Sequence, residues 1–219
     1  MFSLRSFHEE HETDTSTLTI RGRNFTFLLP KSLETFVDSE NVFQNFPLWA
    51  KIWEASIVLA DHLARITAQP EKRFLEIGCG LGVASIVAAS FGHHVIMTEY
   101  NTDALNFARA NVQENLSSTD SNLEVAELDW ENPQLEGAFD CIVGSEVIYN
   151  ERDYQPILNL FKSYLEPQGE IILAERVRET SVEFFRQMSE YFDIKAHKKI
   201  LRSEGEEVRV MLCRMRLLR

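Results

Sequence analysis

The sequence predicts a single α/β domain with a mostly parallel sheet, an antiparallel last strand and helices on both faces. Short buried strands alternate with amphipathic helices from residue 73 to residue 192, which is the pattern of repeated strand–helix units. A glycine-rich loop, Gly78 to Gly82, joins the first strand of this series to its helix. Two alternating segments close the chain around Ser203-Glu204-Gly205, and such a hairpin adds an antiparallel strand to the sheet.

The N-terminal part follows a different pattern. Alternating segments at 15–20 and 25–29 flank the turn Arg21-Gly22-Arg23-Asn24 and predict a β-hairpin, followed by a short helix and a loop. We therefore expect an N-terminal extension over residues 1–46 and the main domain over residues 47–219. The main domain is expected to hold helices at 49–66, 83–91, 103–114, 154–165 and 181–192, strands at 73–77, 94–98, 123–128, 140–145, 170–174, 194–201 and 208–215, and a turn at 167–169.

Composition and charge narrow the classes of partner. The formal net charge is −12 over 219 residues, whereas binding to nucleic acid depends on Lys and Arg neutralising phosphates. A nucleic-acid substrate is therefore not expected, and the charge suits a small molecule or a basic protein partner. One local basic cluster interrupts the acidic chain, and we interpret it as a solvated strand face. This cluster comprises Lys195, His197, Lys198, Lys199 and Arg202.

The cysteines and the apolar runs indicate the compartment. The three cysteines, Cys79, Cys141 and Cys213, are far apart and form no Cys-x-x-Cys pair, so neither a disulfide framework nor a metal site is expected. Residues 1–10 mix charges without an apolar core, unlike a secretory signal. No apolar run approaches the roughly 20 residues that span a bilayer. We expect a cytoplasmic protein that does not insert into membranes.

The glycine loop carries the strongest functional signal. Glu76 precedes three glycines, Gly78, Gly80 and Gly82, in a turn from a strand into a helix, where glycines permit close approach of a ligand to the backbone. A dinucleotide site needs the spacing G-x-G-x-x-G, and the third glycine position is Val83 here. Glu76 would also repel a pyrophosphate. These features favour a ligand without phosphate, although a dinucleotide-binding oxidoreductase and a glycine turn without any ligand remain alternatives.

The pattern Glu-x-Gly-x-Gly-x-Gly resembles the first motif of class I S-adenosylmethionine-dependent methyltransferases. This resemblance implies a Rossmann-like domain with seven strands, and a loop that wraps the methionine and ribose part of S-adenosylmethionine. It implies that Glu99, at the end of the second strand, accepts hydrogen bonds from both ribose hydroxyls, and Glu99 could equally be an acid that starts a helix. It also implies that Asp129 accepts from the adenine amino group and that Trp130 covers the ring, although Asp-Trp could be a plain loop.

The carboxyl end of the fourth strand lies at the switch point of such a sheet, where acceptors bind. The chain has neither the Pro-Pro-aromatic run of amino-methylating DNA enzymes nor a Pro-Cys nucleophile there. Instead, Glu146-x-x-Tyr149 resembles the Asp/Glu-x-x-Tyr motif of the lysine methyltransferases often called methyltransferase family 16. The resemblance implies that Glu146 attracts an ammonium and that Tyr149 contacts it through its ring. Glu146 as a simple strand cap is the alternative, and Ser145 is counted with the cofactor-binding residues.

The segment 46–56 resembles the stretch before the first strand in the same family, where a Trp lies over the cofactor. Trp53 is the better match and Trp49 is expected at the entrance, unless both are core aromatics. We therefore expect an S-adenosylmethionine-dependent methyltransferase acting on a lysine side chain of a protein. A small-molecule N- or O-methyltransferase with an amine substrate is the alternative, and a non-catalytic interaction module that keeps the fold is a further one.

Overall fold

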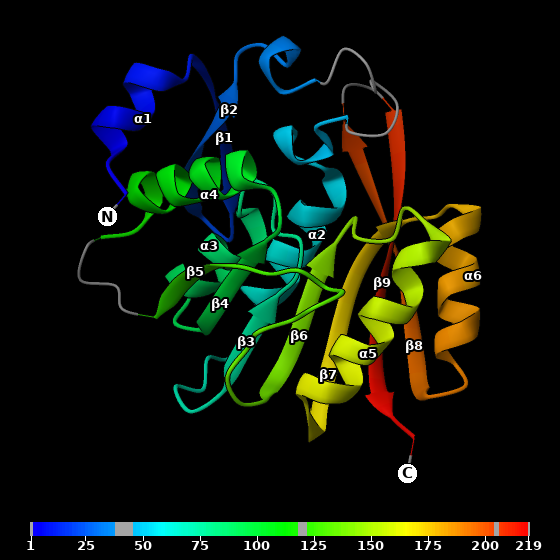
Figure 1. Cartoon of the computed structure of the whole chain (residues 1–219). Coiled ribbons are helices and arrows are strands. Elements are labelled where there is room, and N and C mark those ends of the chain that lie inside the picture. Colours follow the sequence, from blue (N-terminus) through cyan, green and yellow to red (C-terminus); the bar gives the residue numbers. More distant parts are fainter. Residues whose placement is uncertain (1, 38–45, 118–121, 204–205, 219) are drawn as a thin grey trace.

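The computed structural model describes residues 2–37, 46–117, 122–203 and 206–218. A seven-stranded sheet with the order β5-β4-β3-β6-β7-β9-β8 forms its centre (Figure 1). All neighbours pair in parallel except β9, which is antiparallel to both β7 and β8. The strands are β3 (Arg73–Glu76), β4 (His94–Glu99), β5 (Leu123–Glu127), β6 (Phe139–Ser145), β7 (Leu165–Arg176), β8 (Phe192–Ser203) and β9 (Glu206–Leu217). The predicted class of fold is thereby confirmed.

Helices cover both faces of the sheet because successive strand residues point to opposite sides. On β6, Cys141 and Val143 pack toward α2 and α3, whereas Ile142 packs toward α5. One face carries α2 (Glu54–Leu63), α3 (Val83–Ser90) and α4 (Thr102–Asn115), and the other carries α5 (Tyr154–Tyr164) and α6 (Glu179–Met188). Two apolar cores, one on each side, therefore hold the sheet rigid beneath the loops at its carboxyl edge.

The N-terminal extension forms its own two-stranded sheet, β1 (Thr13–Ile20) and β2 (Arg23–Pro30), as predicted. Its turn uses two residues with positive φ, Arg21 at 52° and Gly22 at 78°, which matches the twist of a tight hairpin. A helix that was not predicted, α1 (Leu4–Glu10), precedes the hairpin. Its buried Phe7 meets Phe107 of α4 edge-on, with ring centroids 4.8 Å apart.

Two asparagines of α4 bind the free edge of β2. Asn111 accepts from the backbone N–H of Leu28 at 2.7 Å, and Asn115 accepts from that of Thr26 at 2.8 Å. Their amide groups donate back to the carbonyls of the same two residues. Four residues of helix and two residues of strand each advance by roughly 6–7 Å, so the two spacings match. Asn111 also donates to the carbonyl of Leu81 at 3.0 Å, in the glycine-loop region.

Several predicted boundaries were wrong. The helix expected at 49–66 is interrupted, because Leu48–Ala50 forms a separate 3₁₀ turn and α2 begins only at Glu54. The turn expected at 167–169 lies within β7, where the pairing register with β6 shifts. The helix expected at 181–192 ends at Met188, and the last two strands are longer than predicted.

Parts of the N-terminal segment and of the last hairpin lie outside the described residues. The short helix expected after the hairpin is a 3₁₀ turn at Glu34–Phe36, and the rest of that segment, 38–45, is not described. The same holds for Glu204 and Gly205 in the last hairpin. All three cysteines are buried and free. Among the described residues, no helix combines the length and apolar character that crossing a membrane requires.

Candidate active site

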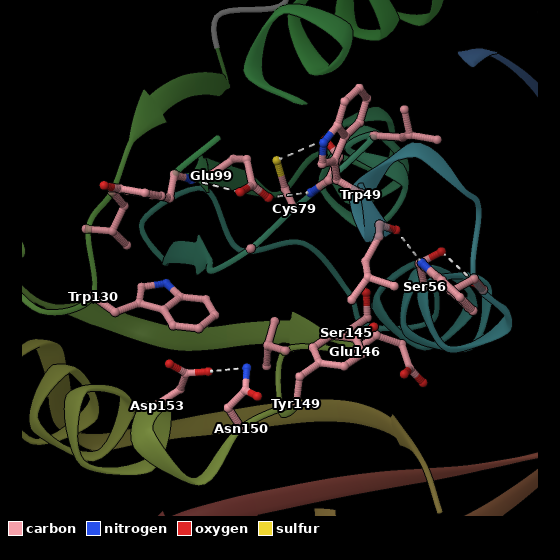
Figure 2. Close-up of a pocket in the computed structure, with 18 of the residues that line it drawn as sticks. Trp49, Ser56, Cys79, Glu99, Trp130, Ser145, Glu146, Tyr149, Asn150 and Asp153 are labelled. Atoms are coloured by element: carbon pink, nitrogen blue, oxygen red, sulfur yellow. Dashed lines mark hydrogen bonds between the residues drawn. The ribbon is translucent and has the colours of Figure 1, made fainter. Parts of the chain in front are cut away.

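A cavity of about 550 Å³ lies at the carboxyl edge of β3, β4 and β6, within the usual range for ligand sites (Figure 2). Figure 2 shows Glu99 and Trp130 on one side of the opening, with Ser145, Glu146 and Tyr149 on another. The cavity brings together most of the residues singled out from the sequence. These are Trp53, Gly78, Gly80, Glu99, Asp129, Trp130, Ser145, Glu146 and Tyr149.

The first two glycines of the loop border the cavity directly. Gly78 and Gly80 have φ values of 61° and 53°, a conformation that L side chains rarely adopt. A Cβ on Gly78 would lie 3.0 Å from Val147 Cγ1 and 3.2 Å from the Trp130 ring. A Cβ on Gly80 would lie 3.3 Å from the carbonyl oxygen of Trp49. The space beside both glycines is therefore too small for a side chain, and a ligand would contact the backbone of the loop.

Glu76 and Gly82 do not line the cavity and instead support the loop from below. Gly82 caps α3 with φ 83°, and a Cβ there would lie 2.8 Å from Met97 Sδ. The buried carboxylate of Glu76 accepts hydrogen bonds from the backbone N–H of Ser85, at 3.1 Å, and from its hydroxyl. Burial raises the pKa of Glu76 to about 7. Direct contact of either residue with a cofactor stays a prediction.

Glu99 joins the end of β4 to the glycine loop. One oxygen, Oε2, accepts from the backbone N–H of Gly80 at 3.0 Å. The other oxygen, Oε1, accepts from the N–H groups of Tyr100 at 2.9 Å and Asn101 at 3.1 Å, just before α4. A carboxylate has about four acceptor positions, and three of them are used here, so about one remains for a donor in the cavity. The contacts with Tyr100 and Asn101 show the role at the start of a helix, whereas binding of the ribose hydroxyls stays a prediction.

Aromatic rings form two walls of the cavity. Trp130 lies against Gly78, and the preceding Asp129 accepts from the N–H of Glu131 at 2.9 Å. Trp53 is fixed by a 2.7 Å hydrogen bond from its indole Nε1 to the carbonyl of Leu48, and Lys51 Nζ lies 5.0 Å from its ring centroid. Trp49 lines the cavity too, and its ring packs against Phe107. Trp49 therefore joins the cavity to the aromatic core of the N-terminal extension.

Glu146 stands where the chain leaves β6, and its φ of 52° is unusual for a non-glycine residue. Its carboxylate accepts from the backbone N–H of Arg176 at 2.7 Å and forms an ion pair with the guanidinium of Arg178. Only 3% of the Glu146 side chain is exposed. Arg178 Cζ also lies 4.7 Å from the ring centroid of Tyr149. Both oxygens of Glu146 therefore have protein partners, which the sequence did not indicate.

Sequence reasoning missed Arg178 and Glu175. Glu175 is fully buried at the end of β7, and its Oε1 accepts from the backbone N–H of Val147 at 2.8 Å. Burial raises the pKa of Glu175 to about 8. A usable signal existed in the sequence, because Glu175 directly follows the strand expected at 170–174, as Glu146 follows the strand expected at 140–145. The pairing of Ser145 with Ala174 then makes these two acids neighbours.

The charges around the cavity decide which kind of cofactor fits. Acidic side chains outnumber basic ones, which disfavours a pyrophosphate and suits a cationic cofactor such as a sulfonium. The acidic residues are Glu99, Asp129, Glu131, Glu146 and Asp153, and the basic residues are Lys51 and Arg152. The narrow glycine loop, the acid beside it and the tryptophan wall suit the methionine, ribose and adenine parts of S-adenosylmethionine. This fold and this cavity define a class I S-adenosylmethionine-dependent methyltransferase.

Comparisons with known proteins agree with this class and specify it. A family model described as lysine methyltransferase matches residues 40–191, and the chain belongs to this family. It is 31% identical to protein N-lysine methyltransferase METTL21A of Danio rerio over 151 residues, covering 66% of this chain and 69% of that protein. It is 26% identical to EEF1A lysine methyltransferase 3 of Mus musculus over 212 residues, covering 86% and 88%.

A solved structure supports the fold. The glycopeptide N-methyltransferase MtfA, complexed with S-adenosyl-L-homocysteine, superposes with a TM-score of 0.63 at 16% identity. The match covers 75% of this chain and 90% of that chain. At this identity the comparison concerns the fold of the domain, whereas the choice of acceptor depends on the cavity itself.

Proposed function

We propose that this enzyme transfers the methyl group of S-adenosylmethionine to the amine of a lysine side chain in a protein. One observation carries the proposal: the Glu146-x-x-Tyr149 segment faces the glycine loop across a single cavity. The names of the curated relatives, which are lysine methyltransferases, support the same acceptor. The formal net charge of −12 also suits a basic partner surface.

The residues of one half of the cavity are assigned to the cofactor, whose sulfonium supplies the reactive methyl group. Glu99 is proposed to bind the ribose hydroxyls, and Asp129 the adenine amino group. Trp130 and Trp53 cover the site and exclude water. The backbone of the glycine loop holds the remaining part, since Gly78 and Gly80 have no side chains of their own. The contribution of the protein is then mainly proximity and orientation.

The other half of the cavity is assigned to the acceptor amine. Glu146 and Tyr149 follow the end of β6, opposite the glycine loop, whereas Ser145, the last residue of β6, is assigned to the cofactor. The Tyr149 ring offers an apolar, electron-rich surface to an aliphatic amine or its methylated product. The nitrogen must be deprotonated to attack, because an ammonium has no lone pair.

Identification of the product tests the proposal. The enzyme is incubated with methyl-labelled S-adenosylmethionine and a lysate of its own cell, and the labelled material is located by mass spectrometry. We expect methylated lysine in a protein. Label confined to a small acid-soluble metabolite would reject the protein substrate and favour a small-molecule amine instead. A matched reaction with the Tyr149→Ala variant controls for label that other enzymes in the lysate transfer.

A further inference from the structure

The guanidinium of Arg178 connects the components of the acceptor end. Arg178 directly precedes α6 and forms an ion pair with Glu146, while its Cζ lies 4.7 Å from the ring centroid of Tyr149. Its Nη2 lies 3.7 Å from Glu175 Oε2. Glu146 and Tyr149 line the cavity, whereas Arg178 does not. The guanidinium therefore lies behind the wall that the acceptor meets.

We propose that Arg178 is a positioning residue for methyl transfer, which fixes Glu146 and Tyr149 from behind and cancels the charge of Glu146 beside the acceptor amine. This inference rests on the proposed function, because it concerns the same acceptor site. It assigns Glu146 an indirect role: its carboxylate holds Arg178 rather than the incoming ammonium.

The backbone around Arg178 is built to hold this arrangement. The N–H of Arg178 donates to the hydroxyl of Ser181 at 3.0 Å, and that buried hydroxyl lies 3.0 Å from the carbonyls of both Arg176 and Arg178. On the opposite side, the N–H of Glu146 donates to the carbonyl of Ala174 at 3.0 Å. The ion pair thus joins two segments whose main chains are already fixed, and it maintains the left-handed conformation of Glu146.

Electrostatics give the ion pair a chemical consequence. A free lysine amine has a pKa of about 10.4, so it is mostly charged at neutral pH. An unpaired carboxylate nearby would stabilise the ammonium further and oppose deprotonation. Pairing Glu146 with a guanidinium removes that opposition. Burial raises the pKa of Glu175 to about 8, so at pH 7 Glu175 is mostly protonated and does not compete for Arg178.

Among the charged groups around the acceptor end, only Glu146 and Glu175 lie within ion-pair distance of Arg178 in the described part of the chain. Arg176 on β7 engages Glu146 through its backbone N–H. Before α5, Arg152 lies 3.6 Å from Asp153, which also accepts from Asn150. The remaining charged side chains of the cavity are Lys51, Glu99, Asp129 and Glu131. A change in pH dependence on substitution of Arg178 therefore reports on the guanidinium and the two acids beside it, Glu146 and Glu175, and Glu175→Gln separates their contributions.

The test is the pH profile of turnover in Arg178→Gln. Loss of the guanidinium leaves Glu146 uncompensated, which raises the pKa of the bound amine. The acid limb of the kcat profile should move to higher pH by about one unit or more. At neutral pH kcat should fall, while KM for the acceptor does not rise. Arg178→Lys keeps a cation and should stay close to wild type. Arg186→Gln, which removes the exposed Arg186–Glu183 pair of α6, is the matched control and should not shift the profile.

Two results would overturn the inference. One is a fall in kcat by the same factor at every pH, which indicates a structural role alone. The other is an Arg178→Gln profile identical to that of wild type. A double-mutant cycle with Glu146→Gln and Arg178→Gln tests the pair without any activity. Its combined loss in Tm should be smaller than the sum of the single losses, and additive losses would contradict the coupling. If wild type labels no lysine, the proposed function fails, whereas this cycle still decides whether Glu146 and Arg178 are coupled.

Discussion

Substitution of Glu99 should lower the affinity for the cofactor directly. Glu99→Ala removes charge-assisted hydrogen bonds of about 1.5–3 kcal/mol, so cofactor affinity should fall roughly tenfold to a hundredfold. Isothermal titration with S-adenosylmethionine measures this. Glu127→Ala is the control, because Glu127 pairs with Glu99 in the β-ladder but is exposed and does not line the cavity. An unchanged dissociation constant in Glu99→Ala would restrict Glu99 to holding the backbone of the loop.

Substitutions at the acceptor end should separate turnover from cofactor binding. Tyr149→Ala and Glu146→Ala should both lower methyl transfer, because each disrupts the wall that meets the amine. Cofactor affinity should stay nearly intact, because neither residue belongs to the glycine-loop side. Glu146→Ala also leaves Arg178 without its carboxylate, so its Tm should fall as well. Activity assays, titration and thermal unfolding of the same preparations distinguish these effects. Full activity in both variants would remove the assigned role of the Glu-x-x-Tyr segment.

Among single residues, the sequence indicated those that lie at or just beyond the ends of strands. Glu99 and Tyr149 are such cases, because their distance along the chain from a buried strand places them at the edge of the sheet. The partners of Glu146 were not predictable in the same way. Arg178 reaches Glu146 across 32 residues, and that contact depends on how the chain leaves β7 and enters α6. Part of the site was thus visible in the sequence, whereas its ion pairs required the tertiary structure.

At the level of helices and strands, stability should depend on Gly82, the residue that caps the start of α3. Gly82→Ala introduces a side chain at φ 83° and places a Cβ 2.8 Å from Met97 Sδ. We expect a loss of stability greater than the about 1–2 kcal/mol of left-handed strain alone, together with weaker cofactor binding. Gly22→Ala is the matched control, because Gly22 has φ 78° with nothing within 4 Å of its Cβ. Chemical denaturation of both variants measures the difference, and equal losses would exclude a packing contribution at Gly82.

The asparagines of α4 provide a second prediction for an element. Asn111→Ala leaves the buried N–H and carbonyl of Leu28 without their partner, at a cost of about 1–3 kcal/mol for each unsatisfied group. Thermal unfolding should show a clear fall in Tm. Asn159→Ala serves as control, because Asn159 is exposed on α5 and pairs only with Gln155 in the described contacts. A Tm equal to that of the control would mean that water replaces the asparagine.

The elements were predictable where their pattern is long. Helix α4 and the strands β3 to β6 agree with the expected ranges within a residue or two, because their apolar positions recur regularly. Helix α1 was missed, since seven residues with one buried side chain carry almost no periodicity. The early start assigned to α2 arose because Ile52 fits helical spacing, although Trp49 lies in the preceding 3₁₀ turn and Ile52 between that turn and α2.

For the whole molecule, two buried acids predict how stability depends on pH. The folded-state pKa values of Glu76 and Glu175 are about 7 and about 8, above their ordinary value of 4.5. The folded protein therefore holds protons that the unfolded chain has released, and the free energy of unfolding should fall as pH rises toward 8. Burial lowers the pKa of His62 and His93. Below about pH 6.5 these histidines therefore make the free energy of unfolding rise with pH, opposite to the two acids. The decline should be clearest between pH 6.5 and 8.

Urea denaturation at several pH values tests this dependence. Glu175→Gln and Glu76→Gln should each flatten the decline, because an amide cannot ionise. Glu183→Gln is the control, since the pKa of Glu183 in the folded protein is about 2 and its titration lies outside the window. A wild-type stability that is constant from pH 6.5 to 8 would contradict the burial of these acids in protonated form.

The class of fold followed from the alternation of strands and helices, and the position of the cavity followed from the glycine loop at a strand end. The order of the strands was not predicted, because the pairing of distant strands is not encoded in local periodicity. The docking of the N-terminal hairpin was not predictable either. It depends on Asn111 and Asn115, which in the sequence look like ordinary polar residues of a helix.

The contacts of Asn111 and Asn115 with β2 bear on which part of the chain folds cooperatively. The match to the family model starts at residue 40, after the hairpin. Yet a single amide group, that of Asn111, contacts both Leu28 in the hairpin and Leu81 beside the glycines. The match to the family model and cooperative folding therefore define different boundaries in this chain. We expect a fragment trimmed to the matched residues to retain the chemical groups of the site but to lose one anchor of the loop that presents them.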